Sequence, residues 1–449
     1  MVVEKRTRGG SRRLARAARV RLELMRARSR LRQSMIPIPC AYLVVAIVLG
    51  ILSPKIDSLV GSHVNPSVGT GAARDVLTST ATGMIAFTGF VVSAVLLVVQ
   101  FAAGQYSARL VLWFRRDQLV KHAIGSFLAA PLFALVALRE IDLETSPYSP
   151  DITVVISLAL LVGAAVLFLA LLQRTLDELR PRSLFERVVR QGVRAARDTY
   201  PVRLDPAVDG QTPPPNPGWQ AREPRELLLS GRPGVLASFD RNLLLAAATV
   251  AGVTIELVPG VGEYISHRQV LLRVHGHGPV DDELLRRAVV VSEERTIEQD
   301  PAFALRAIVD TGIRALSAAI NDPTTAVHSL DSIEVLVREL ATRDLESPLT
   351  LDERGEVRVV WRAPSWRDLV ELAFAEIRMY GVGSIQVCRR LRAVLEDLCS
   401  TTPILRHPAL EEQLEQLEAS LQREFVSDSA ELATAQSADR TGLGLGRVT

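Results

Sequence analysis

Four long apolar stretches dominate the hydrophobic pattern of this chain, and all of them lie within its first 173 residues. Each holds about 18–25 residues, enough for a helix that crosses the ~30 Å hydrocarbon core of a bilayer. None contains Asp, Glu or Arg, and a backbone in lipid must satisfy its own hydrogen bonds, which favours helices. The pattern therefore predicts four transmembrane helices near residues 35–52, 77–101, 119–138 and 152–172.

Beyond these stretches the apolar pattern becomes shorter, and charged and turn-forming residues interrupt it. Alternating stretches typical of strands are mixed with stretches of helical period. We therefore expect a mainly α protein, with a four-helix transmembrane bundle followed by a cytosolic α+β domain. Its predicted parts are a basic cytosolic head at 1–34, the transmembrane domain at 35–173, a membrane-proximal basic helix at 174–200, a proline-rich linker at 201–224, the α+β domain at 225–425 and a disordered tail at 426–449.

Two helical segments outside the apolar stretches carry further expectations. The apolar stripe of residues 365–399 keeps a helical period throughout, which predicts one long helix. The basic segment at 174–200 has two interpretations. Either it lies along anionic lipid headgroups, or it is a solvated helix whose arginines mark the end of the fourth span.

Basic residues mark every other flank of the four stretches. Residues 1–35 carry eleven Arg and one Lys against two Glu, and the second connection and the segment after the fourth stretch are also basic. The first connection instead balances Lys55 and Arg74 with Asp57 and Asp75. Because basic flanks stay in the cytoplasm, we expect a multi-pass protein of the cell (inner) membrane with both termini cytoplasmic and the lipid bilayer as partner.

The second apolar stretch has one polar face. At 100° per residue, Thr82, Gly89, Ser93 and Gln100 fall within a narrow sector of the helix, together with Thr78. Such a face either lines a narrow pore or packs tightly against a neighbouring helix through small residues. No ionisable residue lies in the middle of this stretch, which argues against a proton-coupled pump.

A polar cluster follows where this stretch meets the cytosol. It consists of Gln105, Arg109, Arg115 and Asp117, next to Gln100 and Arg116. One interpretation is an interface with the cytosolic domain or with an anionic ligand. The other is interfacial anchoring by long side chains that reach the headgroups.

A second group of polar residues lies in the predicted α+β domain. Arg306, Asp310 and Arg314 recur at i, i+4 and i+8 of one helix. With Asp300, Asn321 and Asp322 they form either a ligand or metal pocket, or a salt-bridge ladder with two helix caps. The caps are expected because Asp-Pro stands at both 300–301 and 322–323, and no loop has the spacing of a calcium site.

Catalytic and cofactor motifs do not occur in the sequence. There is no Gly-Lys-Ser/Thr phosphate loop, no His-Glu-x-x-His and no Gly-x-Ser-x-Gly. His275 and His277 share a strand face, but two ligands alone make a weak metal site, and we expect a solvated turn. The sequence thus predicts no enzyme activity, no cofactor and no metal. The basic head is tethered to the first span, which favours lipid headgroups over nucleic acid.

Two segments carry the motifs of a known family. The first segment contains Val99-Gln100-Phe101-Ala102-Ala103-Gly104-Gln105-Tyr106-Ser107-Ala108-Arg109-Leu110. The second contains Glu294-Arg295-Thr296, Gln299-Asp300 and Ile320-Asn321-Asp322-Pro323-Thr324-Thr325-Ala326. Through them the chain resembles, over roughly residues 25–400, an uncharacterised bacterial membrane protein family, the domain of unknown function twenty-two fifty-four. Ala108 and Ala318-Ala319 stand where the family has Pro and Pro-Gly. The resemblance implies a four-span membrane protein with a cytosolic domain, and it implies no reaction.

Three functions remain in order of preference. The first is an oligomeric channel or passive transport protein that pools several second spans and is gated by the cytosolic domain. The second is a non-conducting scaffold or sensor that recruits a partner or binds a small ligand through that domain. The third is an enzyme acting on lipid, which lacks a nucleophile or a metal cluster in this sequence.

Overall fold

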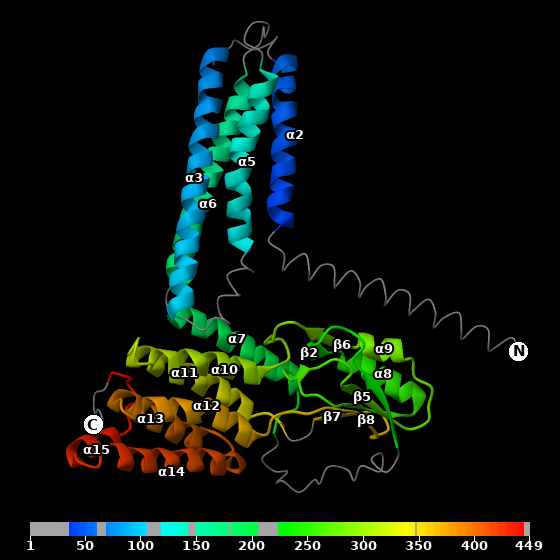
Figure 1. The fold of residues 1–449 in the computed structure, drawn as a ribbon, viewed down its shortest axis with the longest axis vertical. Helices are drawn as coiled ribbons and strands as arrows, with labels where there is room; N and C mark the ends of the chain where they lie inside the picture. Colours follow the sequence, from blue (N-terminus) through cyan, green and yellow to red (C-terminus); the bar gives the residue numbers. More distant parts are fainter. Residues whose placement is uncertain are drawn as a thin grey trace, which may run out of the picture. The chain divides into compact units, whose positions relative to one another are not determined.

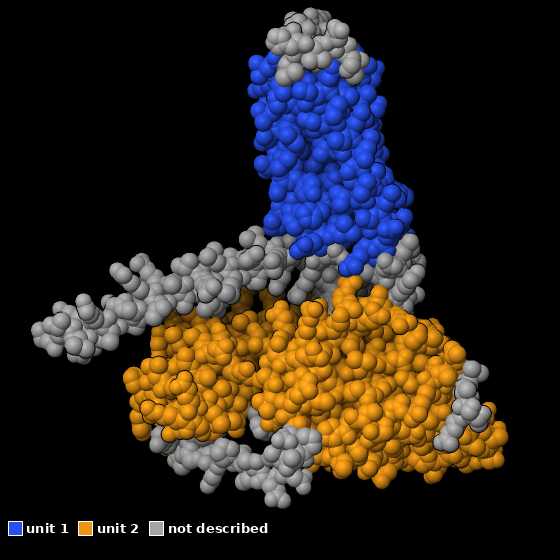
Figure 2. All heavy atoms as spheres, turned by 180° about the vertical axis from the view of Figure 1, so that it is seen from behind, with its two compact units in different colours: residues 1–180 blue, residues 181–449 orange. Residues whose placement is uncertain are grey.

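A computed structural model describes residues 36–60, 69–105, 118–141, 150–178, 181–204, 223–345 and 348–443. The chain divides into two compact units, residues 1–180 and residues 181–449 (Figure 2). The first unit is a bundle of long apolar helices and the second mixes helices with small sheets (Figure 1). The expected fold class, a helical bundle followed by an α+β domain, is therefore confirmed.

The first unit consists of four described helices, each long and apolar enough to cross a membrane. Helix α5 is central, since it packs against the other three and 56% of its apolar window is buried, against 17 to 22% for the others. The helices extend past the apolar stretches that predicted them. Their bounds are α2 (Pro37–Val60), α3 (Thr70–Gln105), α5 (Gln118–Glu140) and α6 (Asp151–Glu178).

Close packing of α2 on α5 depends on two glycines. A Cβ added to Gly50 would lie 2.8 Å from the Val136 side chain, and one added to Gly125 would lie 2.8 Å from the ring of Tyr42. Such separations are too short for real Cβ atoms. The two helix backbones thus approach each other as closely as the small residues allow, which is how helices gain van der Waals contact in lipid.

Asp57 lies inside α2, although the sequence placed it in the first connection. Its side chain is 2% exposed and accepts hydrogen bonds from the backbone nitrogens of Ile152 and Thr153, at 2.8 and 3.0 Å. The Thr153 hydroxyl donates a third bond at 2.6 Å. Because the first N–H groups of a helix lack intrahelical acceptors, the Asp57 carboxylate caps α6 from another helix.

The second unit begins with a helix and continues with two sheets and a group of helices. Its elements are α7 (Pro181–Thr199), β1 (Pro224–Leu228), β2 (Gly234–Phe239), α8 (Arg241–Ala251), β3 (Thr254–Leu257), β4 (Tyr264–Ile265), β5 (Val270–His275), α9 (Asp282–Arg287), β6 (Val289–Ser292), α10 (Pro301–Ala315), α11 (Pro323–Ala341), β7 (Leu349–Leu351), β8 (Val357–Val360), α12 (Trp366–Gly381), α13 (Ile385–Thr401), the short η3 (Ile404–Arg406), α14 (His407–Glu424) and α15 (Ser429–Ala435).

The described strands form a five-stranded sheet, in the order β1-β5-β3-β8-β7, and a three-stranded sheet, in the order β4-β2-β6. Among these described strands, only β3 and β8 pair in parallel. Alternating residues of the five-stranded sheet, including Ile255, Leu272 and Val359, fill one apolar core with Leu244 of α8. This alternation is the one that predicted strands in this region.

Helix α7 belongs to the second unit. The sequence instead predicted a membrane-proximal helix that is separate from the soluble domain. Its apolar face packs against α10 and α11. A Cβ on Gly192 would lie 2.7 Å from Ala304 and 2.9 Å from Leu336, so the contact is close. The apolar side of α7 is therefore used inside the protein, and only its basic side stays exposed.

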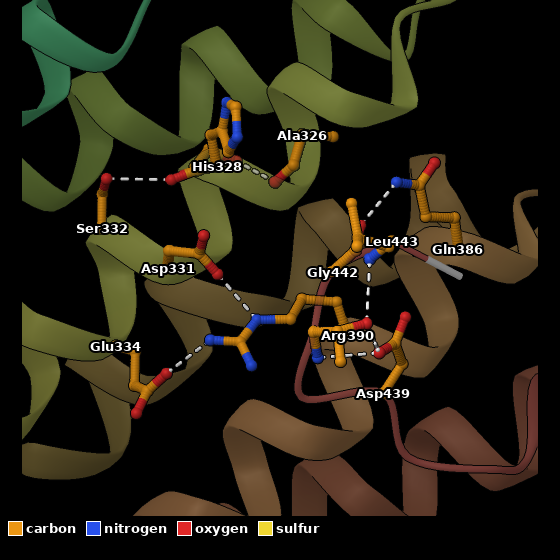
Figure 3. A network of polar contacts seen from close by, with 12 residues as sticks. Ala326, His328, Asp331, Ser332, Glu334, Gln386, Arg390, Asp439, Gly442 and Leu443 are labelled. Carbon is orange, nitrogen blue, oxygen red and sulfur yellow. Dashed lines mark hydrogen bonds and ion pairs between the residues drawn. The ribbon is translucent and has the colours of Figure 1, made fainter. Parts of the chain in front are cut away.

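Two further expectations need correction. The single helix expected over residues 365–399 is two helices, α12 and α13, with a break at residues 382–384 that contains Gly383 and the N-cap Ser384. The tail expected to be disordered contains α15, and residues after it pack on α13. There the backbone nitrogen of Asp439 donates to the Arg389 carbonyl. The Gln386 side chain donates to the Gly442 carbonyl (Figure 3).

Candidate functional site

The polar face of α3 lies on the outer surface of the helical bundle. Thr82, Gly89, Ser93 and Gln100 are all exposed, as is Thr78. A Cβ added to Gly89 would meet no atom within 4 Å. The Ser93 hydroxyl donates only to its own helix, to the Gly89 carbonyl at 3.0 Å. The face predicted to line a pore or to pack is thus uncovered by the described residues of this chain.

The opposite side of α3 packs against α5 and α6 inside the bundle. Thr88 donates to the carbonyls of Met84 and Phe127, at 2.6 and 3.1 Å. Phe87 contacts the rings of Phe127 and Phe168 edge to face. The Thr88 hydroxyl, which points inward, is therefore hydrogen-bonded within the bundle, whereas Thr82 and Ser93 lie on the outer surface.

The predicted cytosolic interface is described only at its beginning. Gln105 is the last residue of α3, so the helix continues to it from the apolar stretch. Arg109, Arg115 and Asp117 lie outside the described residues. The proposed role of this cluster stays a prediction.

Asp300 connects the start of α10 to Arg295, which follows strand β6. Its side chain accepts from the backbone nitrogen of Phe303 at 3.0 Å and from Nε of Arg295 at 2.5 Å. The Arg295 guanidinium also lies 5.4 Å from the centre of the Phe303 ring. Burial raises the pKa of Asp300, and the Arg295 charge and hydrogen bonds oppose that rise. The carboxylate thus caps a helix and pairs with a partly exposed arginine.

Gln299 and Tyr200 complete this region, and neither was among the predicted site residues. The Gln299 side chain bonds to the backbone nitrogen and oxygen of Phe239, at 3.0 and 3.1 Å, as a neighbouring strand would. The Thr199 hydroxyl donates to the Gln299 carbonyl. Burial, followed by the Asp300 charge, raises the pKa of Tyr200. The family motif, which includes Gln299-Asp300, was the available signal for this junction.

Arg306 and Asp310 meet as their spacing on one helix suggested. Nε of Arg306 lies 2.5 Å from Asp310, and its terminal nitrogens bond to Glu376 of α12. The Glu376 and Asp310 carboxylates raise the pKa of Arg306, and the Arg306 hydrogen bond lowers the pKa of Glu376. This bidentate pair holds α10 and α12 together, a link that sequence spacing within α10 does not reveal.

The remaining predicted pocket residues lie around the turn between α10 and α11. Arg314 is in the last turn of α10, and Asn321 adopts the left-handed backbone, with φ of 48°. Asp322 caps α11 by accepting from the backbone and hydroxyl of Thr325, at 3.1 and 2.6 Å. Asp300 and Asp322 therefore cap two different helices, while Arg306 and Asp310 pair within α10. Within the described ranges, no three metal-binding side chains come together.

Glu339 connects α7 to α11 and was also missed by sequence reasoning. It accepts from Nε and Nη2 of Arg197, at 3.1 and 2.9 Å, and from Arg343 at 2.5 Å. Hydrogen bonds from Arg197 and then from Arg343 lower the pKa of Glu339 to about 2. Arg197 and Glu339 are 142 residues apart, so no local pattern predicts their contact.

Comparison with known proteins places the chain in a family without an assigned activity. It is 28% identical over 369 residues to an uncharacterized protein of Mycobacterium bovis, a match that covers 80% of this chain and 70% of that protein. An uncharacterized protein of Mycobacterium tuberculosis matches with the same identity and coverage. No solved structure matches the chain. The profile described as "Predicted membrane protein (DUF2254)" matches residues 32–397, and the chain belongs to this family of membrane proteins.

Proposed function

We propose that the protein is an oligomeric channel or passive transport protein of the cell (inner) membrane. In this proposal several copies place the polar face of α3 around a shared axis, and the second unit gates the pathway from the cytoplasm. The observation that carries the proposal is the exposure of Thr82, Gly89, Ser93 and Gln100 on the bundle surface. Four helices enclose little space, so a pathway has to form between copies.

The chemistry of the α3 face supports passive movement. Between Asp75 and Gln105 the helix contains no ionisable residue, so it offers hydroxyls, glycines and an amide but no proton carrier. At about 1.5 Å per residue, the 36 residues of α3 extend beyond a ~30 Å hydrocarbon core. A polar stripe of this length would run through the whole bilayer.

Asp75 suggests which solutes would pass. It is exposed and precedes Thr82 by seven residues, two helical turns, so it shares the polar face. A ring of such carboxylates at one mouth of a pathway attracts cations and repels anions. We therefore propose small cations as the preferred solutes.

The test uses single cysteines in the full-length protein, after Cys40, Cys388 and Cys399 have been replaced by alanine. Ser93→Cys lies on the α3 face, and Val166→Cys is its matched control on α6, where Val166 is 59% exposed. The purified variants are reconstituted in liposomes, and potassium and chloride fluxes are measured before and after treatment with a thiol reagent. We expect potassium flux that exceeds chloride flux, and block by the reagent in Ser93→Cys alone.

Two results would contradict the proposal. One is the absence of flux for every ion and for osmolytes from liposomes that contain folded protein. The other is equal block, or no block, at both cysteine positions. Asp75→Asn should reduce the preference for potassium over chloride, and an unchanged preference would remove the assigned solute class alone.

The alternative function is a non-conducting scaffold or sensor, and one observation favours it. Thr82 and Ala86, and again Gly89 and Ser93, are small residues four apart on the exposed side of α3. This spacing lets helices of two copies pack with no space between them. Efficient cross-linking of Ser93→Cys between copies, with no flux, would support this function instead.

A further inference from the structure

Two arginines on neighbouring helices of the second unit share a hydroxyl instead of a carboxylate. Nη1 of Arg378 on α12 donates to the Ser420 Oγ at 2.9 Å, and Nη2 of Arg423 on α14 reaches the same oxygen at 3.3 Å. Arg378 also donates to the Gln416 side chain at 2.8 Å, and Arg423 donates to the Ala419 carbonyl. Every acceptor in this set is neutral.

Other arginines on α14's neighbouring helices differ in their partners. Arg367 of α12 pairs with Glu412 at 2.6 Å, and Arg392 of α13 pairs with Glu418 at 2.6 Å. Both carboxylates belong to α14, the helix that also carries Ser420 and Arg423. Carboxylates are thus available along α14, but none is within ion-pair distance of Arg378 or Arg423 in the part of the chain that the structure describes.

The acidic side chains next to the two arginines are directed elsewhere. Glu376, on the same helix as Arg378, bonds to Arg306. Glu424, next to Arg423 in the chain, has its Oε1 beside Gly383, 3.6 Å from where a Cβ on that glycine would lie. Burial and the charge of Arg423 together lower the pKa of Arg378, as expected for two cations without an anion between them.

The geometry fixes several donors for a ligand. Ser420 is only 8% exposed and donates its own proton to the Gln416 carbonyl at 2.8 Å, so its oxygen can accept from both arginines. A guanidinium carries five N–H donors, and the contacts above use two on each arginine. The terminal donors that remain on both side chains suit the oxygens of a tetrahedral dianion.

We propose that Arg378 and Arg423, held by Ser420 and Gln416, bind a phosphate dianion. The ligand is inorganic phosphate or the phosphomonoester group of a small molecule or a lipid. Two adjacent positive charges match a doubly charged oxoanion better than they match a monovalent carboxylate or chloride. The site lies outside α3, so it does not depend on the proposed channel.

The experiment titrates inorganic phosphate into the full-length protein in neutral detergent, by calorimetry at constant ionic strength. We expect saturable binding with one phosphate per chain, and about tenfold weaker binding in Arg378→Gln and in Arg423→Gln, as for loss of a charge-assisted hydrogen bond. The matched control is Arg367→Gln, which removes a carboxylate-paired arginine from the same pair of helices. Its affinity for phosphate should stay within about twofold of the original.

Thermal unfolding without phosphate provides an independent readout. Removing Arg423 relieves repulsion, so Arg423→Gln should unfold at the same or a higher temperature, and a clear decrease would indicate a structural role instead. Absence of saturable phosphate binding, or equal affinity in Arg423→Gln, overturns the site. Preferential binding to phosphatidic acid over phosphatidylcholine vesicles, with competition by phosphate, assigns the lipid source. Binding of free phosphate without that preference assigns a soluble ligand.

Discussion

At the scale of residues, arginine forms nearly all of the ion pairs among the described residues of the second unit. The chain has only three lysines, Lys5, Lys55 and Lys121, so nearly every basic side chain is a guanidinium that stays charged at all accessible pH values. The pH dependence of these contacts therefore comes from the carboxylates. Hydrogen bonds from Arg197 and Arg343 lower the pKa of Glu339 to about 2.

Glu339 should make the stability of the second unit depend on acid. Its folded pKa of about 2 lies below the ordinary value of 4.5, so the protonated form favours the unfolded chain. Its contribution is fully present above about pH 4.5 and is lost as the pH falls toward 2. We expect Glu339→Gln to lower the free energy of unfolding by about 1–2 kcal/mol near pH 7, since the partner Arg197 is largely exposed.

Thermal unfolding of full-length protein across this pH range provides the measurement. The difference between the original protein and Glu339→Gln should shrink as the pH falls from 4.5 to 2. Glu186→Gln is the control, because Glu186 forms only exposed pairs with Arg182 and Arg190. A difference that stays constant with pH would contradict the role of ionised Glu339.

At the scale of elements, glycine positions distinguish helix faces that are already packed from those that are not. Gly50 and Gly125 lie where α2 and α5 meet, and a Cβ at either would clash. Gly89 of α3 and Gly163 of α6 face open space within 4 Å. The same residue type thus marks an internal contact in one case and an uncovered surface in the other.

Substitution at these glycines should give opposite results. Gly50→Ala forces apart the backbones of α2 and α5, with an expected loss of about 1–3 kcal/mol. Gly163→Ala adds a methyl group in open space and gains helix propensity, so stability should stay constant or rise by up to about 1 kcal/mol. Unfolding temperatures of the two detergent-solubilised variants provide the comparison. Equal temperatures would show that the contact between Gly50 and Val136 is not close in solution.

Local pattern predicted the elements better than their partners. Length and apolar character predicted four spans, because the thickness of a bilayer sets the length of a spanning helix. The break between α12 and α13 was missed, although Gly383 and Ser384 carry the signal, because the apolar stripe continues in phase on both sides. Asp57 was assigned to the first connection because it is charged, although α2 continues through it to Val60. Its partner is the start of α6, 95 residues away.

For the candidate sites too, contacts within one helix were predictable from the sequence and contacts between elements were not. The spacing of Arg306 and Asp310 on one helix predicted neighbours, and they contact each other. Glu376 and Gln299 meet their partners through tertiary packing, as Glu339 meets Arg197, so no spacing in the sequence identifies these contacts. For α3 the sequence identified the polar face, whereas its exposure depends on where the other three helices pack.

At the scale of the whole molecule, the order of spans determines which segments share a compartment. Four spans return the chain to the side on which it began, and basic flanks favour the cytoplasm for that side. The α2–α3 connection would then face the opposite compartment from α7. This orientation is a proposal that single cysteines can test.

We expect an impermeant maleimide to label Gly69→Cys in intact cells and Arg182→Cys only after the membrane is permeabilised. Gly69 precedes α3 and is exposed, and the side chain of Arg182 at the start of α7 is 83% exposed, so both cysteines are accessible to the reagent. The native cysteines are replaced as before. Labelling of both positions from the same side would contradict a four-span arrangement.

The packing of α7 inside the second unit has a mechanical consequence. Helix α7 is held against α10 and α11 by the close contact at Gly192 and by the pairing of Arg197 with Glu339. A rotation of α7 about its own axis would therefore push against Ala304 of α10 and Leu336 of α11. Movement of this helix cannot occur without rearranging the two helices on which it packs.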